Sequence, residues 1–406
     1  ASQAKGKSRA YNLLRSQDVI STLNCIRKLG IKVKLKKKYC EIEGLGLNKF
    51  KNKKKIVLNA GNSGTLGRLI LGLLVHFDNK VKIIGDKSLS QRDFSRVIVP
   101  LKKFGASFKY TKNYKLPLEI NGKKNVKPIK YEENKGSAQC KSSVMLAAIN
   151  TKGETVIKAK KSRNHTEILF KYLKIPIKIK KKKNFDLIKI KGGYQFNNLN
   201  YNIPSDISSS AFFIVLTLLS NKSKLTIKNV NINPSRIGIV TILKKMGAKI
   251  FIKNIKIYKG ERIADINIVN TKNLKAINCP KNLNSQAIDE FLLIFLVAAK
   301  AKGVSFFKDL SELNQKESPR LKLGSKILNS MGIKTILTNS SIKIFGDPSI
   351  KPKKFIEIKN YLKDHRIFMM GVIAALSFGG QWKIHDPDSI KTSFPSFLKL
   401  IKQLKN

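Results

Sequence analysis

The chain has 406 residues, of which 81 are Lys or Arg and 25 are Asp or Glu, so its formal net charge is +56. Apolar residues make up 42% of the chain, which is enough for a sizeable core and excludes a disordered basic tail. The sequence holds no apolar run of about 18 residues, so we expect no membrane-spanning helix. The cysteines are scattered and form no C-x-x-C motif, which favours a reducing compartment, the cytoplasm.

The positive charge suggests nucleic-acid binding, but its distribution argues against that function. The basic residues are 70 Lys and 11 Arg, and Lys occurs in every stretch of the chain. Proteins that read phosphates or bases use Arg forks and stacking aromatic side chains. We therefore interpret most Lys residues as background composition and expect no specific nucleic-acid partner. A basic nucleic-acid-binding protein stays as a remote alternative, and each Arg becomes more informative than a Lys.

An internal repeat organises the chain. Predicted amphipathic helices end at a Gly or Lys, an alternating strand follows, and these marks recur every 69 to 85 residues, at Gly30, Gly105, Lys174, Gly247, Gly332 and Lys405. Between the marks, short polar clusters open apolar runs, with landmarks at Thr65, Gln139, Ser209, Asp289 and His365. A helix that is apolar on all faces is buried, its polar first residues cap it, and its N-terminus favours anions.

The repeat predicts an α/β protein of six βαβαββ units in two domains. The expected domains are residues 1–203 and 204–406, because Pro204 interrupts the strand pattern before a new polar-headed helix. Six marks call for six buried helices, yet the sequence holds five such runs. We therefore expect the start of the first unit to precede Ala1.

Two motifs near the start of the chain suit anionic ligands. Gly61–Thr65, which includes Gly64, opens the first buried helix, and glycines there let a ligand approach the backbone. A tight turn into a core helix explains the same residues equally well. Arg92 follows a polar loop and is suited to clamp a carboxylate with two hydrogen bonds. An exposed Arg at a helix start is the simpler interpretation of that residue alone.

Further polar groups stand at other predicted helix starts. Ser137-Ala138-Gln139 opens the second buried helix, and Ser162 to Glu167 opens a surface helix. Helix capping explains either group without a ligand. His165 by itself is more typical of a structural histidine.

Two charged clusters indicate acid–base chemistry. Lys316-Glu317-Ser318-Pro319-Arg320 and Asp364-His365-Arg366 each crowd opposite charges at a helix opening, which can separate pKa values beside a substrate. A solvated ion-pair turn is the alternative. Asp289 is expected to cap its helix or to accept a proton from a substrate hydroxyl. No His or Cys cluster has the spacing of metal ligands, so we expect no metal site.

Taken together, these motifs closely resemble the 5-enolpyruvylshikimate-3-phosphate (EPSP) synthase family. GNSGT, the Arg92 loop, SAQ, SR-x-HTE, SDISS, KES-x-R and DHRI occur in the family's order, and the match runs from Asn12 to Pro395. The resemblance implies a two-domain, inside-out α/β barrel of the enolpyruvyl transferase type, with three repeats in each domain and a hinge. It implies transfer of the enolpyruvyl group of phosphoenolpyruvate to the 5-hydroxyl of shikimate 3-phosphate, releasing phosphate. This reaction leads to chorismate and the aromatic amino acids, and it uses neither metal nor cofactor.

The resemblance also implies the roles of individual residues. The expected shikimate 3-phosphate contacts are Thr65, Ser137, Ala138, Gln139, Ser162, Asp289 and Lys316. The expected phosphoenolpyruvate contacts are Gly64, Arg92, Gln139, Arg320, His365, Arg366 and Lys391. Asp289 and Glu317 are expected to transfer protons, with Lys316 and His365 also catalytic. We further expect a cytoplasmic monomer whose partners are these two small anions, without membrane attachment.

Several departures from the family pattern bear on these expectations. The family's Lys-Ser-x-x-x-Arg segment is not in the sequence, so the resemblance is to an N-terminally truncated member. We expect the chain as printed to lack transferase activity unless that segment is restored, and an inactive member is one alternative. Pro319 and Ser205 replace a usual Asp and Gly, and Lys391 is shifted by one place. The rival enzyme, a UDP-N-acetylglucosamine enolpyruvyl transferase, uses a loop Cys that has no counterpart here.

Overall fold

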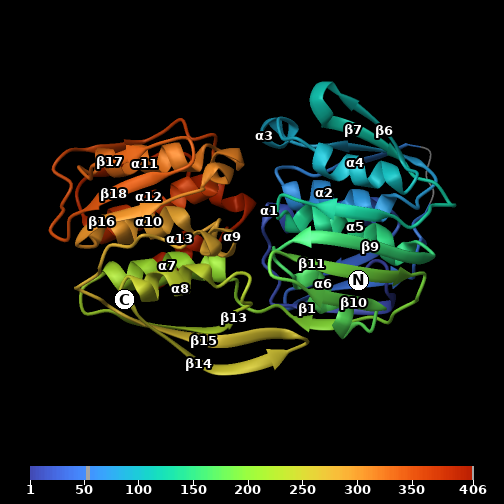
Figure 1. Ribbon diagram of the computed structural model, residues 1–406, viewed down its shortest axis with the longest axis horizontal. Helices are drawn as coiled ribbons and strands as arrows, with labels where there is room; N and C mark the ends of the chain where they lie inside the picture. Colours follow the sequence, from blue (N-terminus) through green and yellow to red (C-terminus); the bar gives the residue numbers. More distant parts are fainter. Residues whose placement is uncertain (52–54, 405–406) are drawn as a thin grey trace. The chain divides into compact units, whose positions relative to one another are not determined.

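The computed structural model describes residues 1–51 and 55–404 and divides the chain into two compact units, Ala1–Ile203 and Pro204–Asn406 (Figure 1). Each unit buries its own cluster of hydrophobic side chains. The division falls between Ile203 and Pro204, where the strand pattern of the sequence is interrupted. Lys405, the last of the six sequence marks, lies outside the described residues.

Within the residues described for unit 1, the strands form three four-stranded sheets. Their orders are β12-β1-β3-β2, β4-β5-β7-β6 and β10-β11-β9-β8, and each contains one parallel pair and two antiparallel pairs. A parallel pair requires a crossover and an antiparallel pair allows a hairpin, so the second and third of these sheets are each one βαβαββ unit in chain order. In the first sheet, the parallel partner of β1 is β12, from the end of unit 1. The strands are β1 (Lys5–Tyr11), β2 (Lys32–Leu35), β3 (Tyr39–Leu45), β4 (Ile56–Asn59), β5 (Lys80–Ile84), β6 (Ser107–Thr111), β7 (Lys115–Asn121), β8 (Lys130–Glu133), β9 (Gly153–Lys160), β10 (Ile177–Lys181), β11 (Phe185–Gly192) and β12 (Asn200–Asn202).

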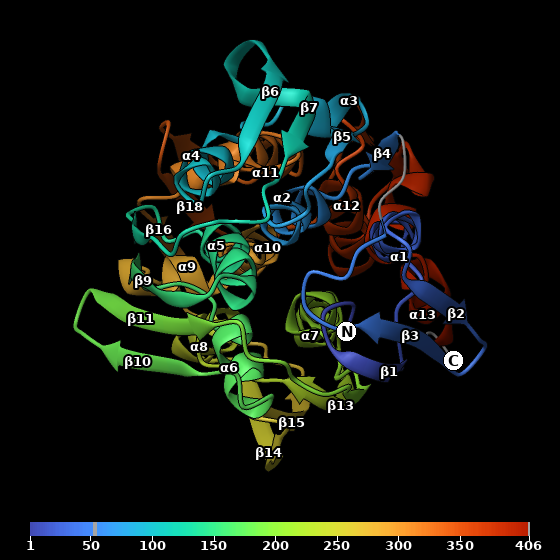
Figure 2. The same cartoon turned by 90° about the vertical axis from the view of Figure 1, so that its right-hand side faces the viewer.

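The helices of unit 1 form an inner and an outer set. The inner helices α2 (Gly64–Leu74) and α5 (Ala138–Asn150) lie side by side, with the sheets outside them (Figure 2). The outer helices are α1 (Gln17–Lys28), α4 (Ser95–Lys103) and α6 (His165–Tyr172), and short turns form α3 (Lys87–Ser90) and η1 (Lys112–Tyr114). The inner pair corresponds to the two apolar runs that the sequence predicts for this unit.

Unit 2 repeats the arrangement with smaller sheets. In its described part, the strands pair as β13-β15-β14, β16-β18-β17 and β19-β20. These strands are β13 (Lys224–Asn231), β14 (Lys249–Tyr258), β15 (Glu261–Val269), β16 (Gly303–Phe307), β17 (Thr335–Leu337), β18 (Ile342–Gly346), β19 (Ile356–Ile358) and β20 (Trp382–Ile384). The inner helices are α7 (Ile207–Leu219), α10 (Phe291–Lys300) and α12 (His365–Phe378), and the outer ones are α8 (Gly238–Lys245), α11 (Arg320–Ser330) and α13 (Phe397–Gln403). Short turns form η2 (Lys281–Leu283), α9 (Asn284–Ala287), η3 (Ser311–Gln315) and η4 (Pro387–Thr392).

The helix starts and ends follow the sequence signals. The side chains of Ser63, Ser137, Asp206 and Asp364 each accept a backbone N–H at the start of an inner helix, which confirms the predicted caps. Past the outer helices, the backbone has a positive φ at Gly30, Gly105, Lys174, Gly247 and Gly332. The predicted left-handed helix ends are therefore confirmed at these marks.

The far ends of the inner helices are closed by strands. A Cβ atom at Gly192, the last residue of β11, would lie 2.0 Å from the carbonyl oxygen of Ala148 in α5. A Cβ atom at Gly346, the last residue of β18, would lie 2.1 Å from the carbonyl oxygen of Ala301 just past α10. Only a residue without a side chain fits at such a distance, so these two glycines allow the strand backbone to pack on the helix ends.

Candidate functional site

In unit 1, the starts of the two inner helices bring together a hydrogen-bonded chain of three side chains. Arg68, one turn into α2, donates from Nη1 to Oε1 of Gln139 at 2.7 Å. Gln139, in the first turn of α5, donates from Nε2 to Oγ1 of Thr65 at 2.8 Å. Both ends of the Gln139 amide are therefore held, and its orientation is fixed by its neighbours. Arg68 also stands over the ring of Phe94, 5.5 Å from its centroid.

A second arginine approaches the backbone at the start of α2. A Cβ atom at Gly64 would lie 2.8 Å from Nη1 of Arg92 and 3.3 Å from Nη1 of Arg68. Nη2 of Arg92 lies 3.5 Å from Oδ1 of Asn62. Two guanidinium groups thus reach the same helix N-terminus, whose backbone N–H groups also favour negative charge. This part of unit 1 has the chemistry of an anion site.

The serines predicted as ligand contacts differ in what their hydroxyl groups do. Ser137 caps α5 by accepting the backbone N–H of Cys140 at 3.3 Å, and Ala138 begins the helix. The hydroxyl oxygen of Ser162, in the loop before α6, is buried and has no hydrogen-bond partner. A buried hydroxyl without a partner costs free energy. Helix capping therefore explains the hydroxyl of Ser137 but not that of Ser162.

In unit 2, a buried ion pair joins the two charged motifs. Arg320 donates to Asp364 twice, from Nε to Oδ2 at 2.8 Å and from Nη2 to Oδ1 at 3.1 Å. Ser318 donates its hydroxyl to the same carboxylate at 2.8 Å. Both charged side chains are almost fully buried, at 2% and 0% exposure. Burial alone would raise the pKa of Asp364, but the charge of Arg320 overrides it and holds that pKa below its usual value.

Two more carboxylates surround Arg320. Glu317 accepts a hydrogen bond from Nη2 of Arg320, and Oδ1 of Asp289 lies 3.7 Å from Nη1. Oδ1 of Asp289 also lies 3.4 Å from Nζ of Lys316. Burial would lower the pKa of Arg320, yet the carboxylates of Asp364, Glu317 and Asp289, in this order of effect, raise it above its usual value. The structure thus brings the predicted catalytic residues Asp289, Lys316 and Glu317 together around one guanidinium group.

The predicted capping role of Asp289 is wrong. Helix α10 begins at Phe291, and its N-cap residue is Glu290. The short helix α9 precedes it and ends at Ala287, so Asp289 lies in the turn between two helices. In this turn, Oδ1 of Asp289 pairs with Nζ of Lys316. The alternative role proposed from the sequence, a carboxylate available to a substrate, remains.

The start of α12 places a neutral imidazole beside an arginine. Nδ1 of His365 lies 3.4 Å from Oγ1 of Thr392, and burial lowers the pKa of His365 to about 4 despite the nearby Asp364. His365 is therefore a neutral hydrogen-bonding group at pH 7. Arg366 donates from Nη1 to the backbone carbonyl of Asp289 at 2.8 Å, and the same nitrogen lies 3.9 Å from Oε1 of the buried Glu290.

Lys391 lies in η4 and pairs locally. Its Nζ atom is 2.7 Å from Oδ1 of Asp388, and its side chain is 57% exposed. The next residue, Thr392, contacts His365. Sequence reasoning did not single out Thr392, Arg68 or Ser318 as contacts; for Arg68 the scarcity of Arg and its place after GNSGT were the available signals.

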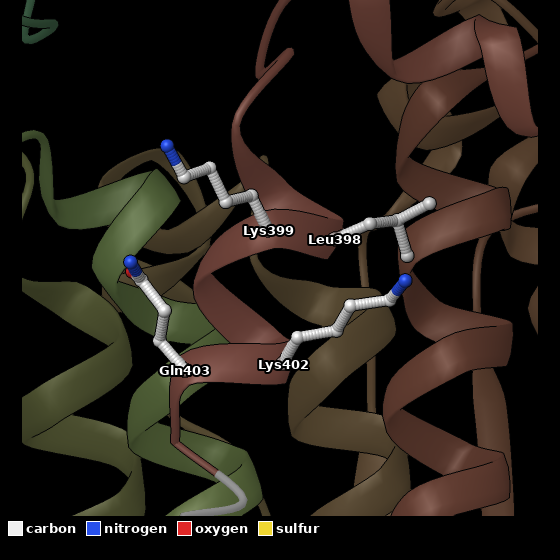
Figure 3. Close-up of a pocket in the computed structure, with 4 residues that line it drawn as sticks. All are labelled: Leu398, Lys399, Lys402 and Gln403. Atoms are coloured by element: carbon white, nitrogen blue, oxygen red, sulfur yellow. The ribbon is translucent and has the colours of Figure 1, made fainter.

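Other features of the described chain do not add a second site. Residues 1–51 and 55–404 hold no group of three His, Cys, Asp or Glu side chains that could bind a metal ion. Nor does this part of the chain have a helix with the length and hydropathy that crossing a membrane requires. An open hollow on α13 is lined by Leu398, Lys399, Lys402 and Gln403 and contains none of the predicted site residues (Figure 3).

Comparison with known proteins gives a match over almost the whole chain. The family model of EPSP synthase (3-phosphoshikimate 1-carboxyvinyltransferase) matches residues 1–401. A 3-phosphoshikimate 1-carboxyvinyltransferase from Ruthia magnifica subsp. Calyptogena magnifica is 41% identical over 404 residues, covering 99% of this chain and 91% of the relative. The enzyme of the same name from Streptococcus mutans serotype c is 37% identical, covering 100% of this chain and 93% of the relative.

Solved structures agree with the sequence matches. A structure of EPSP synthase from Acinetobacter baumannii has a TM-score of 0.86 and 34% identity, covering 98% of this chain and 90% of that one. The enolpyruvyl transferase NikO from Streptomyces tendae, at 13% identity, has a TM-score of 0.76 over 100% of this chain and 90% of its own, which shows a shared fold. The expected α/β fold of the enolpyruvyl transferase type is confirmed. This chain belongs to the EPSP synthase (3-phosphoshikimate 1-carboxyvinyltransferase) family.

Proposed function

We propose that this protein transfers the enolpyruvyl group of phosphoenolpyruvate to the 5-hydroxyl of shikimate 3-phosphate and releases phosphate. The observation that carries the proposal is the grouping of Asp289, Lys316 and Glu317 around the buried Arg320. Such a cluster offers carboxylates for proton transfer and cations for anionic substrates within one constellation. Membership in the family over residues 1–401 supports the same reaction.

Shikimate 3-phosphate is bound by groups that the helix starts present. In unit 1 these are Thr65, Ser137, Ser162, Gln139 and the backbone at Ala138, where the N–H groups of the first turn of α5 suit a phosphate. The buried hydroxyl of Ser162 gains a partner when a phosphate oxygen binds it. In unit 2, Asp289 and Lys316 contact the same substrate, with Asp289 at the 5-hydroxyl.

Phosphoenolpyruvate carries a carboxylate and a phosphate, and the arginines match both. Arg92 and the backbone at Gly64 offer one anion site in unit 1, with Gln139 fixed beside it by Arg68. Arg320, Arg366 and the neutral His365 offer hydrogen-bond donors in unit 2. Lys391 completes this set in the proposal, and its long exposed side chain is able to reorient from Asp388.

The reaction then proceeds by addition and elimination. Asp289 accepts the proton of the 5-hydroxyl while that oxygen bonds to C2 of phosphoenolpyruvate, and Glu317 gives a proton to C3, which becomes a methyl group. In the elimination step, Glu317 takes a proton back from the methyl group and the C2–O bond to phosphate breaks. Phosphate leaves with that bonding pair, and the proton held by Asp289 goes to it. Preorganised cations stabilise the charge that develops in both steps.

The test is a direct assay with competing acceptors. The full-length gene product is incubated with phosphoenolpyruvate and either shikimate 3-phosphate or UDP-N-acetylglucosamine, and phosphate and the enolpyruvyl product are measured. Turnover with shikimate 3-phosphate alone is expected. Turnover with UDP-N-acetylglucosamine alone would overturn the proposal. So would the absence of turnover with both acceptors, if the Glu317→Gln variant is then indistinguishable from wild type.

We also propose that the protein acts as a monomer in the cytoplasm, where the shikimate pathway supplies its substrate. The location in the cytoplasm is supported by the cysteines, which are all buried and unbridged: Cys25, Cys40, Cys140 and Cys279. Light scattering coupled to size-exclusion chromatography measures the oligomeric state. A stable dimer at micromolar concentration would contradict the monomer.

A further inference from the structure

A buried ion pair in unit 1 has no role in the proposed chemistry. Nζ of Lys141, in α5, lies 2.6 Å from Oε1 of Glu167, in α6, and the two side chains are 1% and 4% exposed. Lys141 also donates to the backbone carbonyl of Arg163 at 3.0 Å. Among the many Lys residues of this chain it stands out because its charge is fully removed from water.

Stability alone does not explain such a pair. Taking two charges out of water costs free energy, and apolar residues of similar volume often stabilise a fold as well as a buried ion pair does. The second carboxylate oxygen of Glu167, Oε2, is buried without a hydrogen-bond partner, which adds to the cost. A feature that is expensive for folding and yet well formed points to a role in positioning other groups.

Lys141 and the carbonyl group that it binds are neighbours in sequence of two expected shikimate 3-phosphate contacts. Lys141 lies two residues after Gln139 in the first turns of α5, and it fixes the carbonyl of Arg163, the residue that follows Ser162. One side chain therefore joins the segment that carries Gln139 to the loop that carries Ser162. A second tie, from Ser142 to Thr166 at 2.7 Å, connects the same two helices without touching the loop.

We propose that Lys141 and Glu167 are positioning residues that hold the Ser162 loop against the start of α5 for shikimate 3-phosphate. The inference rests on the proposed function, since it names the substrate whose binding the pair supports. Glu167 orients the ammonium group of Lys141, and the ammonium group orients the Arg163 carbonyl. The Ser162 hydroxyl is thereby held at a fixed position relative to Gln139, which is what a bound phosphate requires.

The experiment separates positioning from stability. In the double variant Lys141→Met/Glu167→Met, apolar side chains replace the ion pair, so the thermal midpoint is expected to stay within a few degrees of wild type. The KM for shikimate 3-phosphate is expected to rise about tenfold or more, because the Arg163 carbonyl is no longer held. The KM for phosphoenolpyruvate is expected to change less than about twofold. The single variant Lys141→Arg keeps the positive charge beside Glu167, so its KM for shikimate 3-phosphate is expected to lie between those of wild type and the double variant.

The matched control is Ser142→Ala/Thr166→Ala, which removes the other tie between α5 and α6. Its KM for shikimate 3-phosphate is expected to remain near that of wild type. An unchanged KM in the folded Met/Met variant would overturn the inference, and so would an equal rise in the control. If wild type binds shikimate 3-phosphate in calorimetry without turnover, the same comparison is made with Kd. A wild type that neither binds nor converts it would overturn the proposed function itself, and this inference with it.

Discussion

Asp364 accepts two hydrogen bonds from Arg320 and also caps α12 by accepting the backbone N–H of Arg366 at 2.9 Å. One buried carboxylate therefore ties the KES-x-R motif to the DHR motif, 44 residues further along the chain. The same guanidinium group touches Glu317 and faces Asp289. The guanidinium group between the proposed acid–base residues is thus held by a carboxylate that is itself 0% exposed.

The first prediction concerns this pair. Replacing Asp364 by Ala leaves Arg320 charged and buried without its main partner, and it removes the cap of α12. We expect the free energy of unfolding to fall by about 3–5 kcal/mol, measured by chemical denaturation monitored through the helical circular dichroism signal. Asp388→Ala is the matched control, since Asp388 is 80% exposed and forms only a surface pair with Lys391. Equal losses in the two variants would contradict the importance of the buried pair.

The second prediction concerns Glu317. In the Glu317→Gln variant the side chain keeps its shape and loses its proton-transfer ability, so kcat is expected to fall about 10²–10⁴-fold with little change in either KM. In D2O, wild type is expected to introduce deuterium at C3 of the product, and the variant is expected to do so at a correspondingly lower rate. A variant that retains wild-type kcat would show that another group moves this proton.

The third prediction concerns Arg68, which holds the Gln139 amide at 2.7 Å. With Arg68→Met, the amide loses one of its two fixed partners and the start of α2 loses a cation. We expect the KM values of both substrates to rise about tenfold or more. Arg262→Met makes the same chemical change at an exposed position of β15 and serves as the control. If both variants behave alike, the loss reflects general charge, not the orientation of Gln139.

The fourth prediction is a pH dependence of stability. Burial lowers the pKa of His76 to about 4, and its Nε2 atom contacts Oγ1 of Thr151 at 2.9 Å. The unfolded chain takes up a proton near pH 6.5 while the folded chain takes it up near pH 4, so stability falls as the pH is lowered between these values. His365 acts in the same direction, with a pKa of about 4.

Denaturation at pH 7.5 and pH 5 tests this dependence. The wild type is expected to lose about 1–2 kcal/mol per buried histidine between the two pH values. The His76→Gln variant is expected to lose less over the same interval, by about the contribution of one histidine. An identical pH dependence in the variant would show that His76 does not titrate as its burial implies.

Local sequence signals account for much of the fold. Helix starts at Ser63 and Asp206 follow from capping chemistry, and helix ends at Gly30 and Gly247 follow from their left-handed backbone. Asp289 escaped this reasoning, because a short helix before it places it in a turn rather than at a cap. The sequence pattern of an apolar run does not reveal such an extra turn.

Pairings over long sequence separations were beyond local patterns. The partnership of Arg320 with Asp364 depends on how α11 packs against α12, and for each motif alone a solvated ion-pair turn is an alternative. Lys141 was missed because composition made Lys uninformative, and only burial against Glu167 distinguishes it. The sequence motifs thus identified groups of candidate residues, but only the folded structure shows which of these residues contact one another.

The glycines that let strands pack on the inner helices have an electrostatic consequence. Beyond Gly192, the N–H of Gly193 donates to the carbonyl of Ile149 at 2.9 Å, and beyond Gly346 the N–H of Asp347 donates to Ala299 at 2.9 Å. Backbone N–H groups just past β11 and β18 thus each satisfy one of the free carbonyls at the C-terminal ends of α5 and α10. At their N-terminal ends, near Gln139 and Asp289, the first backbone N–H groups have no carbonyl partner within the helix, and this end carries the positive pole. In α5 and α10 the dipole is therefore partly screened at the C-terminal end, and the unscreened end of α5 is the one to which the proposed function assigns a phosphate.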